Sequence, residues 1–299
     1  MYNKICVGEG LIPSPVKNKK DIFYLINKYS KGISRVESEM LLEYLFDCNR
    51  IDLYTKDLAI NEVTEELYDS LACRWLGGEP VQYITGKAEF MGFDFMVTRD
   101  TLIPRPETEL LVTEILNSPS TLHPSPNTNL RILDLCTGCG NIAVSLAKMS
   151  PEADIIATDI SGAALKIAEK NAALHKVRER IRFCKGDLFD ALMFAKNPEF
   201  DIIVCNPPYV KEGEIPFLQK EVAAEPGIAL NGGEDGLDFY RRIAKGPRGY
   251  LKKGGSLVME IGFGQADAVK DIFSSAKFKI DKVVKDFAGI ERLVWINLL

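Results

Sequence analysis

The chain has 299 residues, 46% of them hydrophobic and 26% charged, which predicts a globular protein of one large or two medium domains. A formal net charge of −5 disfavours tight non-specific binding to nucleic acid, which depends on basic surfaces that release phosphate counterions. We find no signal-peptide core and no apolar stretch near the roughly 18 residues that cross a bilayer, and seven cysteines without framework spacing favour a reducing cytoplasm.

The N-terminal quarter of the chain is expected to be helical. Between residues 20 and 80, apolar residues recur three or four apart, and the last of these segments ends at a Gly77-Gly78 pair. The following aromatic residues alternate with polar residues and glycine around Gly92, which is typical of a β-hairpin. We therefore predict a helical domain over 1–85 and a hairpin linker over 86–100.

The remaining segment, 101–299, is expected to form the second domain. A helix begins near Pro106, with acidic residues in its first turn, and a Ser/Pro/Asn-rich loop follows over 117–129. From residue 130 onwards, short apolar strands alternate with helices, and two final strands flank Gly289. This alternation predicts an α/β fold with a doubly wound, mostly parallel sheet.

Ligands of such sheets bind at the carboxyl ends of the strands. The first strand end carries a G-x-G-x-x-A turn, in which glycines allow close approach of a ligand and the next helix offers free N–H groups. Dinucleotide-dependent dehydrogenases also use this pattern, and it can be an ordinary turn. Its candidate cofactor-binding residues are Cys136, Thr137, Gly138, Cys139 and Gly140.

Two further strand ends carry carboxylates. Asp159 stands 21 residues after Gly138, where an acidic side chain can accept hydrogen bonds from both ribose hydroxyls of a nucleoside. A helix N-cap is the alternative role, and Ser161 suits that role better. Asp187 ends the next strand and could accept a hydrogen bond from an adenine amino group; alternatively it is an exposed turn residue.

The Cys136-Thr-Gly-Cys139 sequence has the spacing of a redox pair. Both cysteines lie in a crowded glycine loop that requires small side chains, so we interpret them as packing residues. We expect no zinc site, because no second cysteine pair has matching spacing and His123 and His175 lie in other segments.

A fourth strand ends in Asn206-Pro207-Pro208-Tyr209. The prolines fix an extended loop without N–H groups, so the loop presents acceptors: the Asn206 side-chain oxygen and the Pro207 carbonyl. Tyr209 adds a flat face. Two acceptors and a ring suit a planar –NH2 group, although a rigid proline turn is the simpler alternative. Held in this way, a poorly nucleophilic amide or aromatic amine could accept a methyl group from a sulfonium donor.

The chain as a whole, from about residue 20 to its end, resembles the HemK/PrmC family of methyltransferases, which modify glutamine in peptide chain release factors. The segments that carry the resemblance are PVQYITGKAEFMG, LIPRPETELLV, DLCTGCGNIAVSLA, NPPYV, EPGIALNGGEDGLDFYRRI and EIGFGQ. NPPY alone is shared with DNA adenine methyltransferases, whereas the PRPETE and GGEDGLDFY segments are far more specific.

The resemblance implies a class I S-adenosylmethionine-dependent methyltransferase domain with a seven-stranded sheet whose last strand is antiparallel. It implies an N-terminal helical domain that recognises the substrate, the glutamine of a Gly-Gly-Gln motif in release factors. By position, Asp187 and Leu188 match cofactor contacts, and so does Asn206. Asn206 to Tyr209 match the catalytic and substrate-binding loop, and Arg105 matches a segment near the active site. Arg105 could instead form a salt bridge at a helix start.

The chain departs from the family pattern at three positions: Cys136 and Cys139 replace the usual Gly and Ser or Thr, and Leu188 stands where some relatives have an aromatic residue. Alternative functions are glutamine methylation of a ribosomal protein and, with less support, amino methylation of DNA adenine, which an acidic chain without an added DNA-recognition domain does not favour. A dehydrogenase would leave the NPPY loop unexplained, and a non-catalytic binding module would leave a full set of site residues unused.

Overall fold

The computed structural model describes residues 21–118, 129–193 and 198–298. Its contacts divide the chain into two units, Met1–Gly77 and Gly78–Leu299, which are described separately here. The domain boundaries expected at residues 85 and 100 stay predictions. Most of the loop expected over 117–129, including His123, and the first 20 residues, for which we expected no secretory signal, lie outside the described residues.

The described part of the first unit consists of helices α1 (Ile22–Lys28), α2 (Arg35–Phe46), α3 (Arg50–Thr55) and α4 (Glu62–Leu76). Each helix begins after a polar side chain that accepts a hydrogen bond from a backbone N–H in the first turn: Asp21, Ser34, Asn49 and Asn61. The interior contains Leu25, Leu41, Leu42, Leu53 and Tyr68, all nearly inaccessible to solvent. The helical prediction for this segment is therefore confirmed, with α3 as an additional short helix.

The second unit starts with a short helix, α5 (Val81–Thr85), and the predicted hairpin. Strands β1 (Lys87–Phe90) and β2 (Phe93–Met96) pair antiparallel, and the turn between them places both Met91 and Gly92 at positive φ. Gly92 adopts this backbone conformation without steric cost, which explains the turn at this position. Phe90 and Phe95 are fully buried, so the hairpin contributes to the core of this unit.

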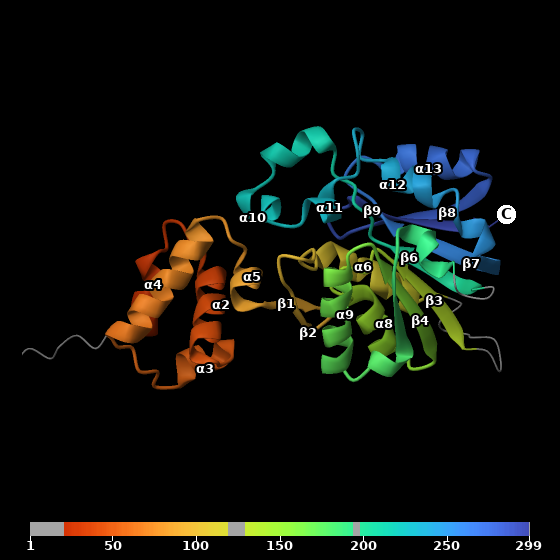
Figure 1. The fold of residues 1–299 in the computed structure, drawn as a ribbon. Helices are drawn as coiled ribbons and strands as arrows, with labels where there is room; N and C mark the ends of the chain where they lie inside the picture. The colour runs from red at the N-terminus through yellow and green to blue at the C-terminus, as the bar shows by residue number, and fades with distance from the viewer. Residues whose placement is uncertain (1–20, 119–128, 194–197, 299) are drawn as a thin grey trace, which may run out of the picture. The chain divides into compact units, whose positions relative to one another are not determined.

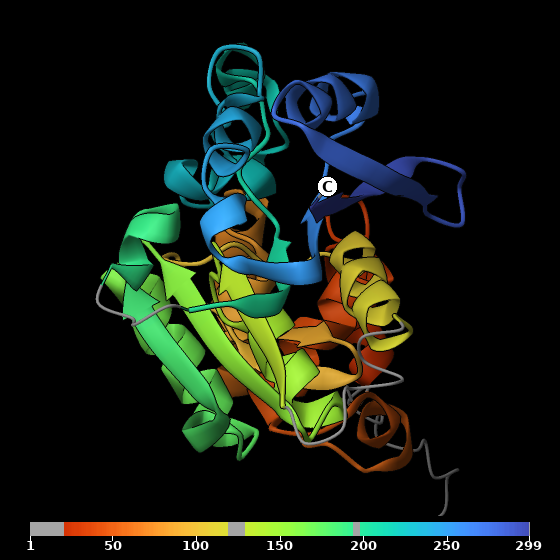
Figure 2. The same cartoon turned by 90° about the vertical axis from the view of Figure 1, so that its right-hand side faces the viewer.

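A seven-stranded sheet in the order β5-β4-β3-β6-β7-β9-β8 forms the centre of the second unit. β9 pairs antiparallel with both neighbours, and the other described pairings are parallel, as the family resemblance implied. Figure 2 shows the twist of this sheet from the green strands to the blue ones. The strands are β3 (Leu130–Leu135), β4 (Ala153–Asp159), β5 (Ile181–Lys185), β6 (Phe200–Cys205), β7 (Leu251–Glu260), β8 (Phe278–Lys285) and β9 (Glu291–Leu298).

Helices cover both faces of this sheet (Figure 1). Because successive strand residues point to opposite faces, Ile132 belongs to the core that contains residues of α6 (Pro106–Leu116), α8 (Asn141–Met149) and α9 (Gly162–Leu174). Its neighbour Leu133 belongs to the opposite core, with α12 (Asp238–Ile243) and α13 (Ala266–Ser275). The doubly wound architecture expected from the sequence is confirmed.

The chain between β6 and β7 was not assigned to elements from the sequence. It contains η3 (Glu212–Phe217), α10 (Lys220–Ala223), α11 (Gly227–Leu230), α12 and η4 (Pro247–Gly249). Two other short 3-10 turns, η1 (Arg178–Arg180) and η2 (Leu188–Leu192), flank β5. These pieces have too few residues for the periodic pattern by which longer helices are recognised.

Candidate active site

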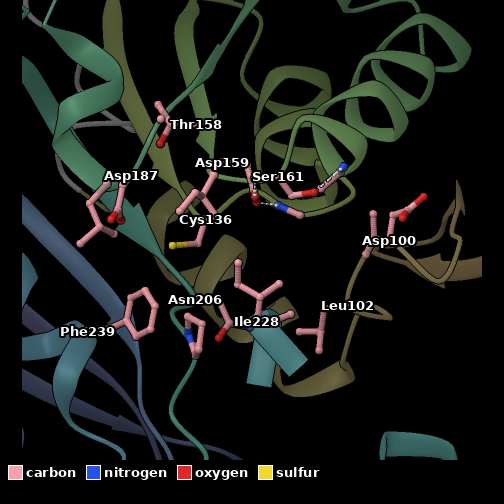
Figure 3. A pocket seen from close by; sticks show the side chains of 18 of the residues that line it. Asp100, Leu102, Cys136, Thr158, Asp159, Ser161, Asp187, Asn206, Ile228 and Phe239 are labelled. Atoms are coloured by element: carbon pink, nitrogen blue, oxygen red, sulfur yellow. Dashed lines mark hydrogen bonds between the residues drawn. The ribbon is translucent and has the colours of Figure 1, made fainter. Parts of the chain in front are cut away.

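A pocket lies at the carboxyl ends of β3, β4, β5 and β6 (Figure 3), where ligands of doubly wound sheets bind. Its wall combines residues at and after the strand ends with residues from the 100–102 segment and from helices α9, α11 and α12. The pocket is lined by Asp100, Thr101, Leu102, Cys136, Gly138, Thr158, Asp159, Ile160, Ser161, Ala164, Gly186, Asp187, Leu188, Asn206, Pro208, Ile228, Ala229, Phe239 and Arg242. Seven residues that we selected from the sequence are therefore brought together: Cys136, Gly138, Asp159, Asp187, Leu188, Asn206 and Pro208.

The glycine loop after β3 contributes only some of its residues to this wall. Cys136 and Gly138 line the pocket, and both have positive φ. Thr137 instead donates a hydrogen bond from its hydroxyl to the Asp134 carboxylate at 2.6 Å. Gly140, also at positive φ, passes so close to α9 that a Cβ atom would lie 2.9 Å from the Ala168 side chain, which explains the need for glycine there.

The two cysteines of this loop belong to different environments. Cys136 packs against the core that contains α12 and α13, while Cys139 is buried in a separate cluster with Tyr83, Ile103 and Ile167. Burial raises the pKa of the Cys139 thiol to about 12, so it stays protonated at neutral pH. A protonated, inaccessible thiol is a poor redox partner, which supports the prediction that these residues serve packing.

Asp159 links the loops after β3 and β4. Its carboxylate accepts hydrogen bonds from the backbone N–H groups of Gly138 at 2.9 Å and Ser161 at 2.8 Å. The Ser161 side chain caps α9, as expected, by accepting a hydrogen bond from the Ala164 N–H at 3.2 Å. Burial raises the pKa of Asp159. A carboxylate offers about four acceptor positions, so capacity remains for two ligand hydroxyls.

Asp187 and Leu188 follow β5. The Asp187 carboxylate forms an ion pair with the Arg242 guanidinium at 2.6 Å, and Arg242 also lies over the Phe239 ring at 5.3 Å. An adenine amino group would therefore share this carboxylate with Arg242, and the predicted contact stays a prediction. Leu188 has a φ of 49° and is mostly buried at the pocket wall, where it can contribute apolar surface.

The Asn206-Tyr209 loop leaves β6 at the other side of the pocket. The Asn206 amide nitrogen donates a hydrogen bond to the Thr108 hydroxyl oxygen at 3.2 Å. Pro208 lines the pocket, whereas Pro207 is buried outside its lining. The Tyr209 hydroxyl donates to the Glu260 carboxylate at 3.1 Å, and burial beside this carboxylate raises the pKa of the phenol.

Arg105 does not line the pocket; it precedes α6 and forms an ion pair with Glu225. The Glu225 carboxylate also accepts a hydrogen bond from the Ile103 N–H at 3.0 Å. This buried glutamate thus holds the 100–105 segment next to α11, and both segments contribute residues to the wall. Arg105 does form a salt bridge at the start of α6, but with a partner 120 residues away.

Sequence reasoning missed several residues of the site. Phe239 and Arg242 line the pocket, and Thr108, Glu225 and Glu260 hold its residues in place. Four of the five lie in the segments PRPETE, GGEDGLDFYRRI and EIGFGQ, which carry the family resemblance, and Glu225 begins the EPGIAL segment. These segments indicated which parts of the chain form the site. No local sequence pattern, however, indicates which of their side chains point into it.

Within the described residues, no group of three or more His, Cys, Asp or Glu side chains is arranged to hold a metal ion. His175 lies against Phe93 and Phe95, and one of its ring nitrogens is 2.7 Å from the Asp94 carbonyl oxygen. None of the helices in the described segments is long and apolar enough to cross a membrane.

Solved structures share the architecture at low sequence identity. A methyltransferase from Pyrococcus furiosus superposes with a TM-score of 0.51, at 16% identity, over 77% of this chain and all of that chain. The N-terminal domain of human METTL16, solved in complex with SAH, gives 0.51 at 17% identity, over 69% of this chain and 75% of that one. These likenesses identify the fold as that of class I methyltransferases.

Family models match both parts of the chain: the PrmC N-terminal domain over residues 25–86 and the methyltransferase small domain over 108–234. S-adenosylmethionine is the methyl donor of this fold and family. Release factor glutamine methyltransferase from Thermodesulfovibrio yellowstonii is 42% identical over 90% of this chain and 94% of its own. That from Clostridium acetobutylicum is 37% identical over 94% of each chain. The chain belongs to the release factor glutamine methyltransferase family.

Proposed function

We propose that this enzyme transfers a methyl group from S-adenosylmethionine to the side-chain amide nitrogen of the glutamine in the Gly-Gly-Gln motif of peptide chain release factors. One observation carries the proposal beyond family membership: Asn206, an amide acceptor, lines the same pocket as Asp159 and the glycine loop. A nucleoside-sized ligand and a planar amide can therefore meet in one cavity. Because release factors act in translation, we place the reaction in the cytoplasm.

The charges of the pocket suit this cofactor. Three carboxylates line it, those of Asp100, Asp159 and Asp187, against the single guanidinium of Arg242. Arg242 is already paired with Asp187. The excess negative charge favours a positively charged ligand, and the free acceptor positions of Asp159 suit two ribose hydroxyls.

The Asn206 loop would prepare the substrate. S-adenosylmethionine supplies an electrophilic methyl group on a positively charged sulfur when it is bound. The Asn206 side-chain oxygen, which lines the pocket, would accept one hydrogen of the glutamine –NH2 group. Pro207 and Tyr209 lie outside the pocket lining, so they would have to be reached from the substrate side of the loop, where the Pro207 carbonyl would accept the second hydrogen and Tyr209 would pack against the amide plane. These contacts turn the nitrogen lone pair towards the methyl group, so catalysis consists mainly of positioning and preorganised electrostatics.

The proton inventory requires no strong base. As the N–C bond forms, the bond between the methyl group and the donor sulfur would break, and its electron pair would stay on the sulfur, which becomes neutral. The nitrogen then gains positive character, and one of its two hydrogens becomes acidic. Asn206 and Pro207 stabilise that hydrogen through their oxygens until it leaves to water. The methylated amide keeps its other hydrogen. The positive charge that the nitrogen gained is removed with the proton that leaves to water.

Mass spectrometry tests the substrate. A release factor is incubated with the enzyme and S-adenosylmethionine, and its peptides are sequenced. We expect one added methyl group on the Gly-Gly-Gln glutamine and none on a release factor in which this glutamine is replaced by alanine. A ribosomal protein methylated on glutamine in place of the release factor, or methylated adenine in added DNA, would contradict the proposal.

A further inference from the structure

Glu260 is a buried carboxylate that the proposed mechanism has not used. It ends β7 and its exposed fraction is 2%. Isolated charges are costly to bury unless hydrogen bonds and charges compensate them. Its partners are residues of the candidate active site, so its burial has a consequence for that site.

Glu260 reaches Asn206 through Thr108. The Thr108 hydroxyl donates to one Glu260 carboxylate oxygen at 2.6 Å, and the Asn206 amide nitrogen donates to the Thr108 oxygen at 3.2 Å. The three residues come from the end of β7, from α6 and from the loop after β6. The chain of hydrogen bonds therefore joins segments that are 98 and 152 residues apart.

The hydrogens available in the hydrogen bonds between Glu260, Thr108 and Asn206 allow the Asn206 amide only one orientation. An ionised carboxylate only accepts hydrogen bonds, so it takes the one hydrogen of the Thr108 hydroxyl. The Thr108 oxygen is then left as an acceptor, and only the –NH2 end of the Asn206 amide can donate to it. The amide oxygen must face the other way, and no described residue donates a hydrogen bond to it. Asn206 lines the pocket beside Phe239 and Ile228 (Figure 3).

The second Glu260 oxygen holds the other end of the same loop. It accepts the hydrogen bond of the Tyr209 hydroxyl at 3.1 Å. Gln265 holds the Tyr209 backbone through a 3.0 Å hydrogen bond to its carbonyl oxygen, and the Tyr240 hydroxyl donates to the Glu260 carbonyl oxygen at 3.0 Å. One carboxylate thus fixes both side chains that flank the two prolines.

The surroundings of Glu260 favour its ionised form in some respects and oppose it in others. Burial, the largest cause, and the charge of Glu107 raise the pKa of Glu260, and the two hydroxyl donors and Arg292 offset this only in part, so that its pKa is raised overall. Each of its oxygens accepts one hydroxyl hydrogen, which is the arrangement of an ionised carboxylate.

We infer that Glu260 and Thr108 are positioning residues for methyl transfer: they force the Asn206 oxygen, and not its –NH2 group, to face the substrate amide. The inference rests on the proposed function for its catalytic consequence. If the Asn206 side-chain amide were turned round, its –NH2 group would face the –NH2 group of the substrate. Both groups offer only donors in the amide plane, so no hydrogen bond could form between them. The orientation of the Asn206 amide therefore decides whether the site accepts hydrogen bonds from the substrate –NH2 group or repels it.

Thr108→Val tests the relay while it preserves side-chain shape, and Thr108→Ser is the matched control that keeps the hydroxyl. We expect Val to lower kcat roughly tenfold or more, because a preorganised acceptor for the transition state is lost. Cofactor affinity should stay within about twofold. The Thr108→Ser variant should keep kcat within about threefold of the parent value. In an Asn206→Ala background, Thr108→Val should lower kcat no further, because Thr108 acts only through Asn206 and the effects of coupled residues do not add.

A second readout needs no substrate. The side-chain amide resonances of Asn206, assigned by their loss in Asn206→Ala, should shift in Thr108→Val and in Glu260→Gln and stay in place in Thr108→Ser. Unchanged resonances together with parental kcat in Thr108→Val would overturn the inference. So would an equal loss of kcat in the parent and Asn206→Ala backgrounds. If the resonances shift as expected but the parent enzyme does not methylate a release factor, the positioning relation stands and the proposed function fails.

Discussion

The two sides of the pocket are held by different kinds of contact. On the side proposed for the cofactor, Asp159 accepts hydrogen bonds from backbone N–H groups, including that of Gly138, 21 residues earlier in the chain. On the side proposed for the substrate, side chains bond to side chains: Asn206 to Thr108, and Thr108 to Glu260. The arrangement of the first side depends on the backbone of the loops. The arrangement of the second depends on side chains that come from distant segments of the chain.

This difference teaches that binding and chemistry should be separable by mutation. Changes on the cofactor side should alter cofactor affinity, and changes on the substrate side should alter turnover.

The largest effect is expected at Asn206. Replacement by alanine removes one acceptor but keeps both prolines, so turnover should fall by about 2–4 kcal/mol of transition-state stabilisation, on the order of 30- to 1000-fold. Single-turnover rates at saturating cofactor measure this loss, with calorimetry as the check that cofactor affinity is unchanged. A turnover equal to that of the parent would reduce the Asn-Pro-Pro-Tyr segment to a rigid turn.

Asn206→Asp sharpens the same comparison. Aspartate keeps an acceptor but adds a negative charge near the sulfonium, which stabilises the charged ground state that the reaction must discharge. We expect turnover to fall here as well, with cofactor affinity equal to or above that of the parent. A fully active aspartate variant would show that acceptor capacity alone is sufficient.

The matching change on the cofactor side is Asp159→Ala. Hydrogen bonds to a charged acceptor contribute about 1.5–3 kcal/mol, so cofactor affinity should fall roughly tenfold or more. Isothermal calorimetry measures this directly. Turnover at saturating cofactor should fall much less than in Asn206→Ala, and the reverse ranking of the two variants would contradict the division between the two sides.

Below the glycine loop, Asp134 should make stability depend on pH. Full burial raises its pKa to about 7, and one of its carboxylate oxygens has no hydrogen-bond partner in the described structure. The folded state therefore binds this proton more tightly than the unfolded chain, and stability should fall as pH rises from about 4 to about 7.

Asp134→Asn removes this titration. Because one pKa unit corresponds to about 1.4 kcal/mol, the parent should lose about 1–2 kcal/mol more unfolding free energy than the variant between pH 5 and 7. Denaturant titrations at both pH values give the difference. Parallel pH profiles for the two proteins would show that the carboxyl group is not perturbed.

The smallest effect is expected for the double variant Cys136→Gly with Cys139→Ser. Glycine adopts the positive φ of residue 136 without strain, and serine keeps a small donor at residue 139. Activity should stay within about twofold of the parent in reducing and in oxidising buffer. A strong redox dependence of the parent that disappears in the variant would restore the redox hypothesis.

Much of the fold could be predicted from the sequence, and so could some of the residues that line the candidate site. Helix α8 begins directly after the glycine loop, as expected, and Asp159 stands at the end of the next strand, because glycine loops and apolar periodicity are local signals. Glu225 and Glu260 were not predicted as site residues. Their roles depend on contacts across more than 50 residues, and neither a glutamate before a short helix nor one at the end of an apolar strand has a local signature.

Site-resolved mass spectrometry of a release factor, treated in parallel with the parent enzyme and with Asn206→Ala at saturating S-adenosylmethionine, tests the central claim most directly. The claim is that the Asn206 loop presents acceptors to a glutamine amide beside the cofactor. It predicts rapid addition of one methyl group to the Gly-Gly-Gln glutamine by the parent and a rate at least about 30-fold lower for the variant. Equal rates for the two enzymes, or a methyl group on any other residue, would contradict it.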